Sequence, residues 1–140
     1  MKQKQYRVAF VCTHNSCRSQ MAEAIAKKVA KDVLIPFSAG TNPNQEINQN
    51  AVKIIMEIYG VDMRKSQHPK LISELPVIDI LITMGCGVNC PMIPCSFRED
   101  WGLDDPTGKA EEIYFLAAAL IKNNILNLKK RIVGKNIIIE

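Results

Sequence analysis

The sequence predicts one α/β domain built on an open, mostly parallel four-stranded sheet with helices on both faces. Short apolar runs alternate with amphipathic segments along the chain, as in sheets whose strands are joined by helices. The 140 residues are the usual length of one domain, and the 47% hydrophobic fraction is enough for one core. No repeat, linker or low-complexity segment divides the chain. We therefore expect residues 1–140 to form one domain.

The first half of the chain supplies two strands and two helices. Tyr6–Cys12 is a continuously apolar run, typical of a strand buried on both faces of a parallel sheet. Residues 19–31 have apolar side chains at helical spacing and lysines in the last turns, where cations complement the helix dipole. A second strand is expected at residues 33–39 and an amphipathic helix at 48–59, ended by Gly60.

The second half supplies the remaining two strands and a long helix. Leu71, Ile72 and Leu75 suit a short helix before the strongly apolar run 77–84. The other expected elements are a loop at 85–94, a strand at 96–101, a loop at 102–109 and a helix at 110–132. The tail 134–140 has a strand-like pattern but no predicted place in the sheet.

Charge and hydropathy exclude several classes of function. The formal net charge of +4 comes from 18 basic and 14 acidic residues spread along the chain, without the dense basic stripe typical of nucleic-acid binding. The apolar run 8–11 is too short for a signal peptide, and no run approaches the roughly 20 apolar residues of a membrane span. We expect a cytoplasmic protein without nucleic-acid or membrane partners. Its five cysteines then favour thiol chemistry or metal binding over a disulfide framework.

The loop between the first strand and the first helix has the features of an oxyanion site. Cys12 ends the strand and Arg18 opens the helix, so the intervening N–H groups can point at a common centre beside the positive helix end. A planar Arg18 guanidinium can bind two oxygens of a tetrahedral dianion, and the same field favours the Cys12 thiolate. Ser19 can donate a hydrogen bond to that thiolate. The expected oxyanion-binding residues are Thr13, His14, Asn15, Ser16, Cys17, Arg18 and Ser19.

The alternative interpretation is a buried, apolar Cys12 and a solvated Arg18. The bare Cys and Arg spacing is weak, because a chain with this composition contains such a pair by chance in roughly one case out of five or six. The flanking strand and helix are what make the pattern specific.

The run Cys12-Thr-His-Asn-Ser-Cys-Arg-Ser-Gln-Met-Ala-Glu23 is similar to the signature of the thioredoxin-coupled arsenate reductases, which share the low-molecular-weight tyrosine phosphatase fold. Further similar motifs follow in the family's order at 37–40, 50–52, 60–62, 83–91 and 101–106, so the resemblance covers roughly residues 6–130. It implies arsenate reduction in arsenic detoxification, with phosphate or sulfate as competing oxyanions and thioredoxin or glutaredoxin as reductant. It also implies a monomer without a tightly bound cofactor.

Thiolate attack on an oxyanion requires an acid that protonates the departing oxygen, and a neighbouring negative charge can raise a carboxyl group into the working range. Asp105 precedes Pro106, and the family's acid lies in a matching Asp-Pro pair. Asp104 is the rival carboxylate. The competing interpretation is that residues 104–106 form only a turn.

A reductase also needs a second thiol, because two electrons must reach the substrate. Cys86 and Cys90 lie in a glycine-containing loop after an apolar strand. We expect Cys86 to attack the Cys12 sulfur and Cys90 to attack Cys86, leaving a disulfide for thioredoxin. The spacing departs from the family's pattern, which has an earlier first cysteine and a wider gap. A Cys86–Cys95 pair, or a route through one cysteine and an external thiol or glutaredoxin, therefore stays open.

Two further expectations concern the loop's surroundings. The backbone amide of Cys17 should matter more than its sulfur. The resemblance implies a monovalent cation site, with potassium in some relatives. Its oxygen ligands would be Asn15, Glu23, Ser38 and Asp62. Alternatively, Asn15 only hydrogen-bonds the loop and Glu23 is a solvated helix residue.

Two other functions compete with reduction. A tyrosine phosphatase would use the same nucleophile, arginine and acid, but Thr107 and Gly108 follow the Asp-Pro pair where substrate-gripping aromatic residues are expected. A metal-binding or sensor module would use the cysteines. The loop cysteines lack the Cys-x-x-Cys spacing of most zinc sites, and His14 and His68 have no partner at a ligand spacing.

Overall fold

The computed structural model describes residues 4–85, 93–137 and 139. Its four strands form one parallel sheet in the order β2-β1-β3-β4. The strands are β1 Tyr6–Cys12, β2 Leu34–Gly40, β3 Ile80–Thr83 and β4 Phe97–Asp100. Cys12 lies opposite Gly40, and Thr83 opposite Asp100, so the carboxyl ends of all four strands meet at one edge. In open α/β sheets, ligands bind at this edge.

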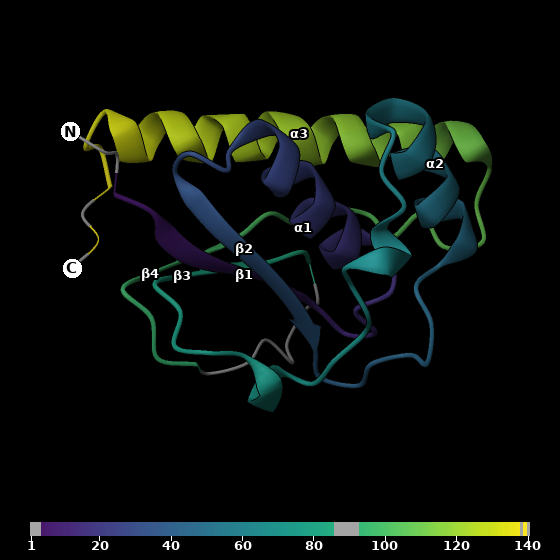
Figure 1. Ribbon diagram of the computed structural model, residues 1–140, viewed down its shortest axis with the longest axis horizontal. Coiled ribbons are helices and arrows are strands. Elements are labelled where there is room, and N and C mark those ends of the chain that lie inside the picture. The colour runs from purple at the N-terminus through teal and green to yellow at the C-terminus, as the bar shows by residue number, and fades with distance from the viewer. Residues whose placement is uncertain (1–3, 86–92, 138, 140) are drawn as a thin grey trace.

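The three α-helices share one core with a single face of the sheet. They are α1 Arg18–Val29, α2 Gln49–Tyr59 and α3 Glu111–Val133. Val8 and Phe10 of β1 join their buried side chains, and α1 lies between α3 and the strands (Figure 1). The other face of β1, with Ala9 and Val11, packs against a smaller cluster that includes Ile72 of the short 3-10 helix η2 Ile72–Glu74. The predicted α/β class and the four-stranded sheet are confirmed. Helical segments lie on both faces of the sheet, but the three α-helices cover one face and, among the described residues, only the short helix η2 packs against the other.

Local chemistry explains where the helices begin and end. The Asn48 side chain accepts hydrogen bonds from the N–H groups of Asn50 and Ala51 and so caps α2. Gly60 closes the same helix with φ 68°, a left-handed conformation that glycine adopts without steric cost. α1 has no side-chain cap at its start, so its first turn leaves backbone N–H groups directed at the loop before it.

The prediction for the third strand was too long. Residues 77–84 form a strand only from Ile80 to Thr83, and Val77 is 81% exposed. The pairing partners decide this length, because β1 and β4 run beside β3 only over four residues. The tail was also predicted to be strand-like, but its described residues form no strand. The backbone N–H of Asn136 instead donates to the Arg131 carbonyl at 2.9 Å, which folds the chain back on the end of α3.

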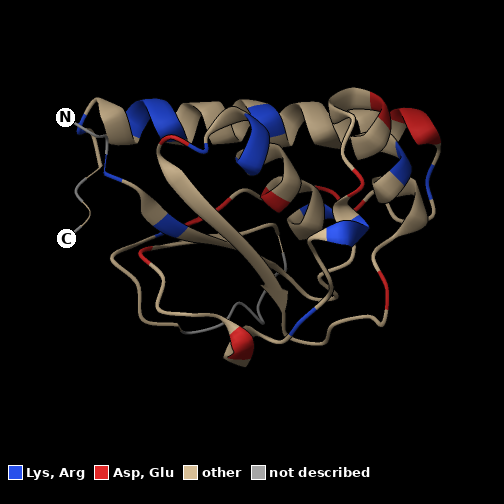
Figure 2. Cartoon of the chain, in the orientation of Figure 1, with Lys and Arg blue, Asp and Glu red and all other residues tan. Residues whose placement is uncertain are grey.

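Charged side chains are distributed over helices and loops, with Lys and Arg interspersed among Asp and Glu (Figure 2). Within the described ranges, no helix combines the length and the apolar character needed to cross a bilayer.

Candidate active site

The loop between β1 and α1 is held in shape from outside. The carbonyl groups of Thr13, His14 and Ser16 accept hydrogen bonds at 2.8–2.9 Å from three backbone N–H groups of the segment 42–48. In a trans peptide the next N–H points away from the carbonyl, so three loop amides face the interior of the loop. Asn15 makes the turn in a left-handed conformation, φ 47°, which asparagine tolerates better than most residues. The result is a ring of donors at the start of α1, suited to an anion.

Gly40, the last residue of β2, lies directly against this loop. A Cβ atom at Gly40 would come within 2.5 Å of the Thr13 carbonyl oxygen and 3.0 Å of the Cys12 carbonyl oxygen. Such contacts are shorter than any packed structure permits, so only glycine lets β2 approach the loop this closely.

The Cys12 sulfur is buried and shares a hydrogen bond with the Ser19 hydroxyl. Their Sγ and Oγ atoms are 2.8 Å apart, and Asn15 Nδ2 donates to the same Oγ at 2.8 Å. The Asn15 amide cannot be reversed, because its Oδ1 accepts the backbone N–H of Lys70 at 3.0 Å. Because Asn15 Nδ2 donates to Oγ, the Ser19 hydroxyl hydrogen stays available to a Cys12 thiolate, which can only accept. A donor in this position stabilises the thiolate over the thiol.

Two buried glutamines extend this network. Gln20 Nε2 donates to the Asn15 carbonyl at 3.0 Å and to its Oδ1 at 3.1 Å. Gln67 Nε2 donates in turn to the Gln20 carbonyl at 3.0 Å and to its Oε1 at 2.8 Å. Sequence analysis did not identify either residue. The polar Gln20 beside the buried Met21 could have signalled a buried network, whereas nothing local marks Gln67.

Arg18 ties the loop to two other segments. Its Nη1 donates to the Met84 carbonyl at 2.7 Å and to the Leu103 carbonyl at 2.6 Å, and the residue is buried. Both bonds use Nη1, and within the part of the chain that the structure describes the Nε–Nη2 edge makes no bond to protein. That edge is the one a guanidinium uses to hold two oxygens of an anion.

Asp105 lines the same cavity as the nucleophile and Arg18. The cavity measures about 170 Å³ and is bounded by Cys12, Thr13, His14, Ser16, Cys17, Arg18 and Asp105. Asp104 instead lines a separate groove against α3. The structure thus brings Asp105, and not Asp104, to the predicted oxyanion site.

Protein groups alone keep Asp105 ionised. Partial burial raises the pKa of Asp105, but hydrogen bonds from the Thr107 side chain and backbone outweigh it, with help from the charges of Arg18 and His14. The net result is a pKa below the usual carboxyl range. Thr107 Oγ1 and N bind one carboxylate oxygen at 2.7 and 3.0 Å. The expected raised pKa therefore depends on the negative charge of a bound oxyanion.

Cys17 lines the cavity but is a poor nucleophile. Burial, followed by the negative charges of Asp105 and Cys12, raises the pKa of Cys17 to about 12. Its thiol is therefore neutral at physiological pH, in line with the expectation that its backbone matters more than its sulfur. Among the described residues, no three His, Cys, Asp or Glu side chains are grouped to hold a metal ion. A larger cavity of about 550 Å³, next to residues 45–49 and 67–69, is lined by none of the predicted site residues.

Three of the four predicted cation ligands are connected, but each has a protein partner. Ser38 Oγ donates to Glu23 Oε1 at 2.7 Å, and Glu23 Oε2 forms an ion pair with Lys27 Nζ at 2.7 Å. Asn15 Oδ1 is occupied by the Lys70 N–H. Glu23 and Asn15 thus already accept from protein donors, and the Ser38 hydroxyl hydrogen is directed at Glu23.

The fourth predicted ligand, Asp62, has a different role. It caps the 3-10 helix η1 Met63–Lys65 by accepting from the Arg64 N–H at 3.1 Å, and it pairs with Arg64 Nε at 2.9 Å. The residues present therefore do not fit a site for a free monovalent cation.

The predicted thiol relay is only partly visible. Cys86 and Cys90 lie outside the described residues. Cys95 is a free, partly exposed cysteine that packs against the smaller apolar cluster.

Comparisons with known proteins agree with this geometry. The family model for low molecular weight phosphotyrosine protein phosphatase matches residues 7–136. The arsenate reductase of Staphylococcus aureus strain Newman is 35% identical over 130 residues, which cover 89% of this chain and 96% of that protein. A solved arsenate reductase in the phosphate binding state superposes with a TM-score of 0.80 at 32% identity, covering 91% of this chain and 98% of that one. The thioredoxin-dependent arsenate reductase of Corynebacterium glutamicum gives 0.74 at 31% identity, with coverage of 96% and 65%.

The similarity includes the parts that make the site. It spans β1, the anion-binding loop, the first helix and the segment with Asp105. This confirms the resemblance found in the sequence. The chain belongs to the low molecular weight phosphotyrosine protein phosphatase family.

Proposed function

We propose that this protein reduces arsenate to arsenite, with Cys12 as the nucleophile. The observation that carries the proposal is the single cavity of about 170 Å³ that joins the Cys12 thiol, Arg18 and Asp105. The curated relative from Staphylococcus aureus and the superposed solved structures are arsenate reductases, which supports this chemistry over others on the same scaffold.

The first step forms a bond between sulfur and arsenic. The Cys12 thiolate attacks As(V) while Arg18 and the loop amides hold the other oxygens. One arsenic–oxygen bond breaks, and that oxygen leaves as water after Asp105 supplies a proton. Arsenate is an anion, so its binding raises the pKa of Asp105 from the low value that the protein groups impose. Binding of arsenate thereby favours protonation of Asp105, the acid that the same reaction requires.

The second step transfers two electrons. We assign it to Cys86, whose thiolate attacks the Cys12 sulfur. A sulfur–sulfur bond forms, and the electron pair of the sulfur–arsenic bond stays on arsenic, which leaves as As(III) arsenite. Cys90 then attacks Cys86, frees Cys12 as a thiolate and leaves a Cys86–Cys90 disulfide. A dithiol of the thioredoxin type reduces this disulfide and becomes oxidised itself. The solved relative from Corynebacterium glutamicum is thioredoxin-dependent, which supports this choice of reductant over glutaredoxin.

The proposal extends to competing oxyanions, cellular location and oligomeric state. We expect phosphate and sulfate to compete with arsenate, because a ring of N–H donors binds any tetrahedral oxyanion of suitable size. A cytoplasmic monomer is consistent with thiols that must be kept reduced.

The test is a coupled assay in which thioredoxin reductase and thioredoxin consume reduced nicotinamide cofactor when arsenate is added. Hydrolysis of p-nitrophenyl phosphate by the same preparation measures phosphatase chemistry. Wild-type protein should oxidise the cofactor only with arsenate present, and Cys12→Ser should abolish both activities. Cys86→Ser should lose arsenate turnover yet retain slow hydrolysis, because only reduction needs the second sulfur.

Hydrolysis without any arsenate-dependent oxidation would return the assignment to a phosphatase. Full arsenate turnover by a Cys86→Ser, Cys90→Ser double variant would overturn the relay and leave Cys95 or an external thiol as the acceptor. In Cys90→Ser, peptide mass spectrometry after one equivalent of arsenate should find a trapped Cys12–Cys86 disulfide.

A further inference from the structure

Lys70 extends its side chain into the group of oxygens behind the anion-binding loop. Its Nζ donates to the Ser38 carbonyl at 3.0 Å and to the His68 carbonyl at 3.1 Å. Its backbone N–H donates to Asn15 Oδ1 at 3.0 Å, and its carbonyl accepts the Gly40 N–H at 2.9 Å. Backbone and side chain together fix this residue against the end of β2 and against the loop.

Two backbone carbonyls contact the ammonium group, and a buried carboxylate lies near it without forming an ion pair. The acidic side chain of Glu23 is only 7% exposed. Ser38 donates a hydrogen bond from its hydroxyl to Glu23 and accepts one from Lys70 Nζ at its carbonyl. Burial lowers the pKa of Lys70, and the Glu23 carboxylate opposes this effect. Lys27 pairs with the other side of Glu23 and lowers the pKa of Lys70 slightly further. If the ammonium group were removed, these carbonyl oxygens and the nearby carboxylate would be open to a free monovalent metal ion.

We propose that the Lys70 ammonium takes the structural place of a monovalent cation, so that the protein needs no potassium to order its anion-binding loop. A tethered cation has an advantage over a free ion, because its local concentration does not depend on the medium. The position also connects it to the nucleophile. Holding Lys70 in place keeps its backbone N–H on Asn15, which in turn keeps Ser19 directed at the Cys12 sulfur.

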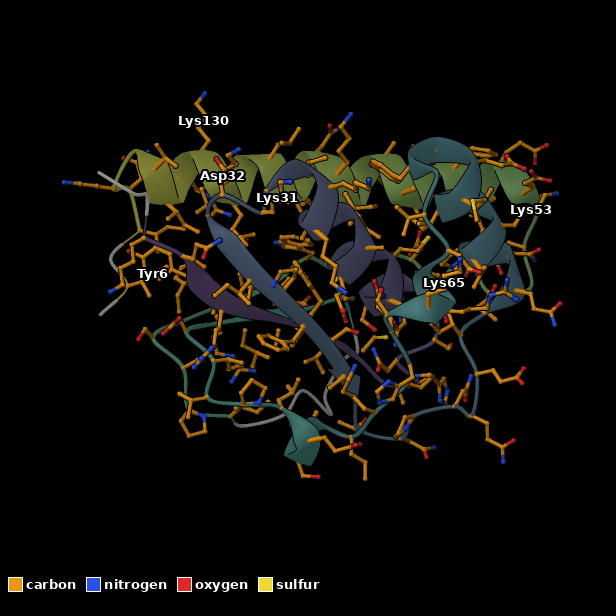
Figure 3. The ribbon with its side chains drawn as sticks, viewed as in Figure 1. Tyr6, Lys31, Asp32, Lys53, Lys65 and Lys130 are labelled. Carbon is orange, nitrogen blue, oxygen red and sulfur yellow. The ribbon has the colours of Figure 1, made fainter. Side chains whose placement is uncertain are left out.

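This inference does not depend on the reaction, so it is tested by thermal unfolding. Melting temperatures are measured in potassium chloride and in choline chloride at equal ionic strength, for wild type, Lys70→Met and Lys65→Met. Methionine keeps the length of the apolar stem but removes the charge. Lys65, labelled in Figure 3, is an exposed lysine of η1 and serves as the matched control.

Wild type and Lys65→Met should melt at the same temperature in both salts. Lys70→Met should melt roughly 3–8 °C lower in choline chloride, as expected for loss of buried polar contacts in a domain of this size. Potassium should restore at least about half of that loss, because the vacated oxygens can bind the free ion.

Three results would overturn the proposal. A potassium-specific rise in the wild-type melting temperature would mean that a free ion already has this role. A Lys70→Met melting temperature equal to that of Lys65→Met would mean that the ammonium contributes nothing. A lowered Lys70→Met value that potassium does not raise would show that the oxygens bind the lysine but are not a cation site.

Discussion

Replacing Ser19 by alanine tests how the protein favours the Cys12 thiolate. The hydroxyl lies 2.8 Å from a buried sulfur and has its hydrogen directed there by Asn15. A hydrogen bond to a charged group is worth about 1.5–3 kcal/mol, which corresponds to a decrease of roughly 10- to 150-fold in the equilibrium constant for ionisation of the thiol. The variant also leaves the buried Asn15 Nδ2 without its acceptor, at a cost to folding stability of about 1–3 kcal/mol.

The assay is the rate of Cys12 alkylation by iodoacetamide as a function of pH, followed by mass spectrometry of the Cys12 peptide. Because only the thiolate reacts, the rate reports its population directly. Ser73→Ala removes a hydroxyl from an exposed position in η2 and is the matched control. Thermal unfolding of the same proteins measures the stability cost separately.

A Ser19→Ala rate within about twofold of wild type at every pH would refute the reasoning, since a hydrogen bond to a charged group is typically worth more than that. In that case the loop amides and the helix dipole alone would account for the thiolate. An equal decrease in Ser73→Ala would mean that the assay reports general loosening and not the loss of one donor.

Three other substitutions separate the parts of the site. Arg18→Lys should retain less than about a tenth of arsenate turnover, because a point charge cannot replace the planar guanidinium edge that holds two oxygens of the anion; near-normal steady-state kinetics would remove Arg18 from the site. Asp105→Asn should lower kcat by about 10²-fold or more while the inhibition constant of phosphate changes little; if Asp104→Asn behaves this way instead, Asp104 is the acid. Gly40→Ala should cost about 1–3 kcal/mol and lower the melting temperature and turnover together, because its Cβ overlaps the loop backbone; an unchanged melting temperature would contradict the close approach.

The parts of the site that follow one another in sequence could be predicted. The apolar run of β1 ends at Cys12 and the helix dipole begins at Arg18, so strand, loop and helix are determined locally. The caps of α2 are also local, because Asn48 and Gly60 act on their immediate neighbours. Such features depend on a few adjacent residues and appear as sequence patterns.

The parts that depend on distant segments could not be predicted. Lys70 binds Asn15 of the loop through its backbone N–H, and its Nζ binds the backbone carbonyls of Ser38 and His68. Every residue carries such backbone groups, so no residue type signals these contacts. The cation site was inferred from the family resemblance at positions whose side chains carry oxygen, and a sequence does not tell which of those oxygens already have partners within the protein. Asp62 has a suitable side chain but pairs with Arg64 two residues away.

The way the anion-binding loop is held has a consequence for selectivity. Its outward carbonyls are fixed by the segment 42–48, and Gly40 lets β2 pack directly against it from outside, so the size of the ring is set by the fold and not by the anion. An anion-binding loop of fixed size recognises the shape and charge of its ligand, and arsenate and phosphate are nearly alike in both. Discrimination between them must then come after binding, from the element itself, since arsenic accepts an electron pair from sulfur far more readily than phosphorus. Arsenate and phosphate would then be distinguished by how easily they are reduced, in the step in which the second thiol attacks.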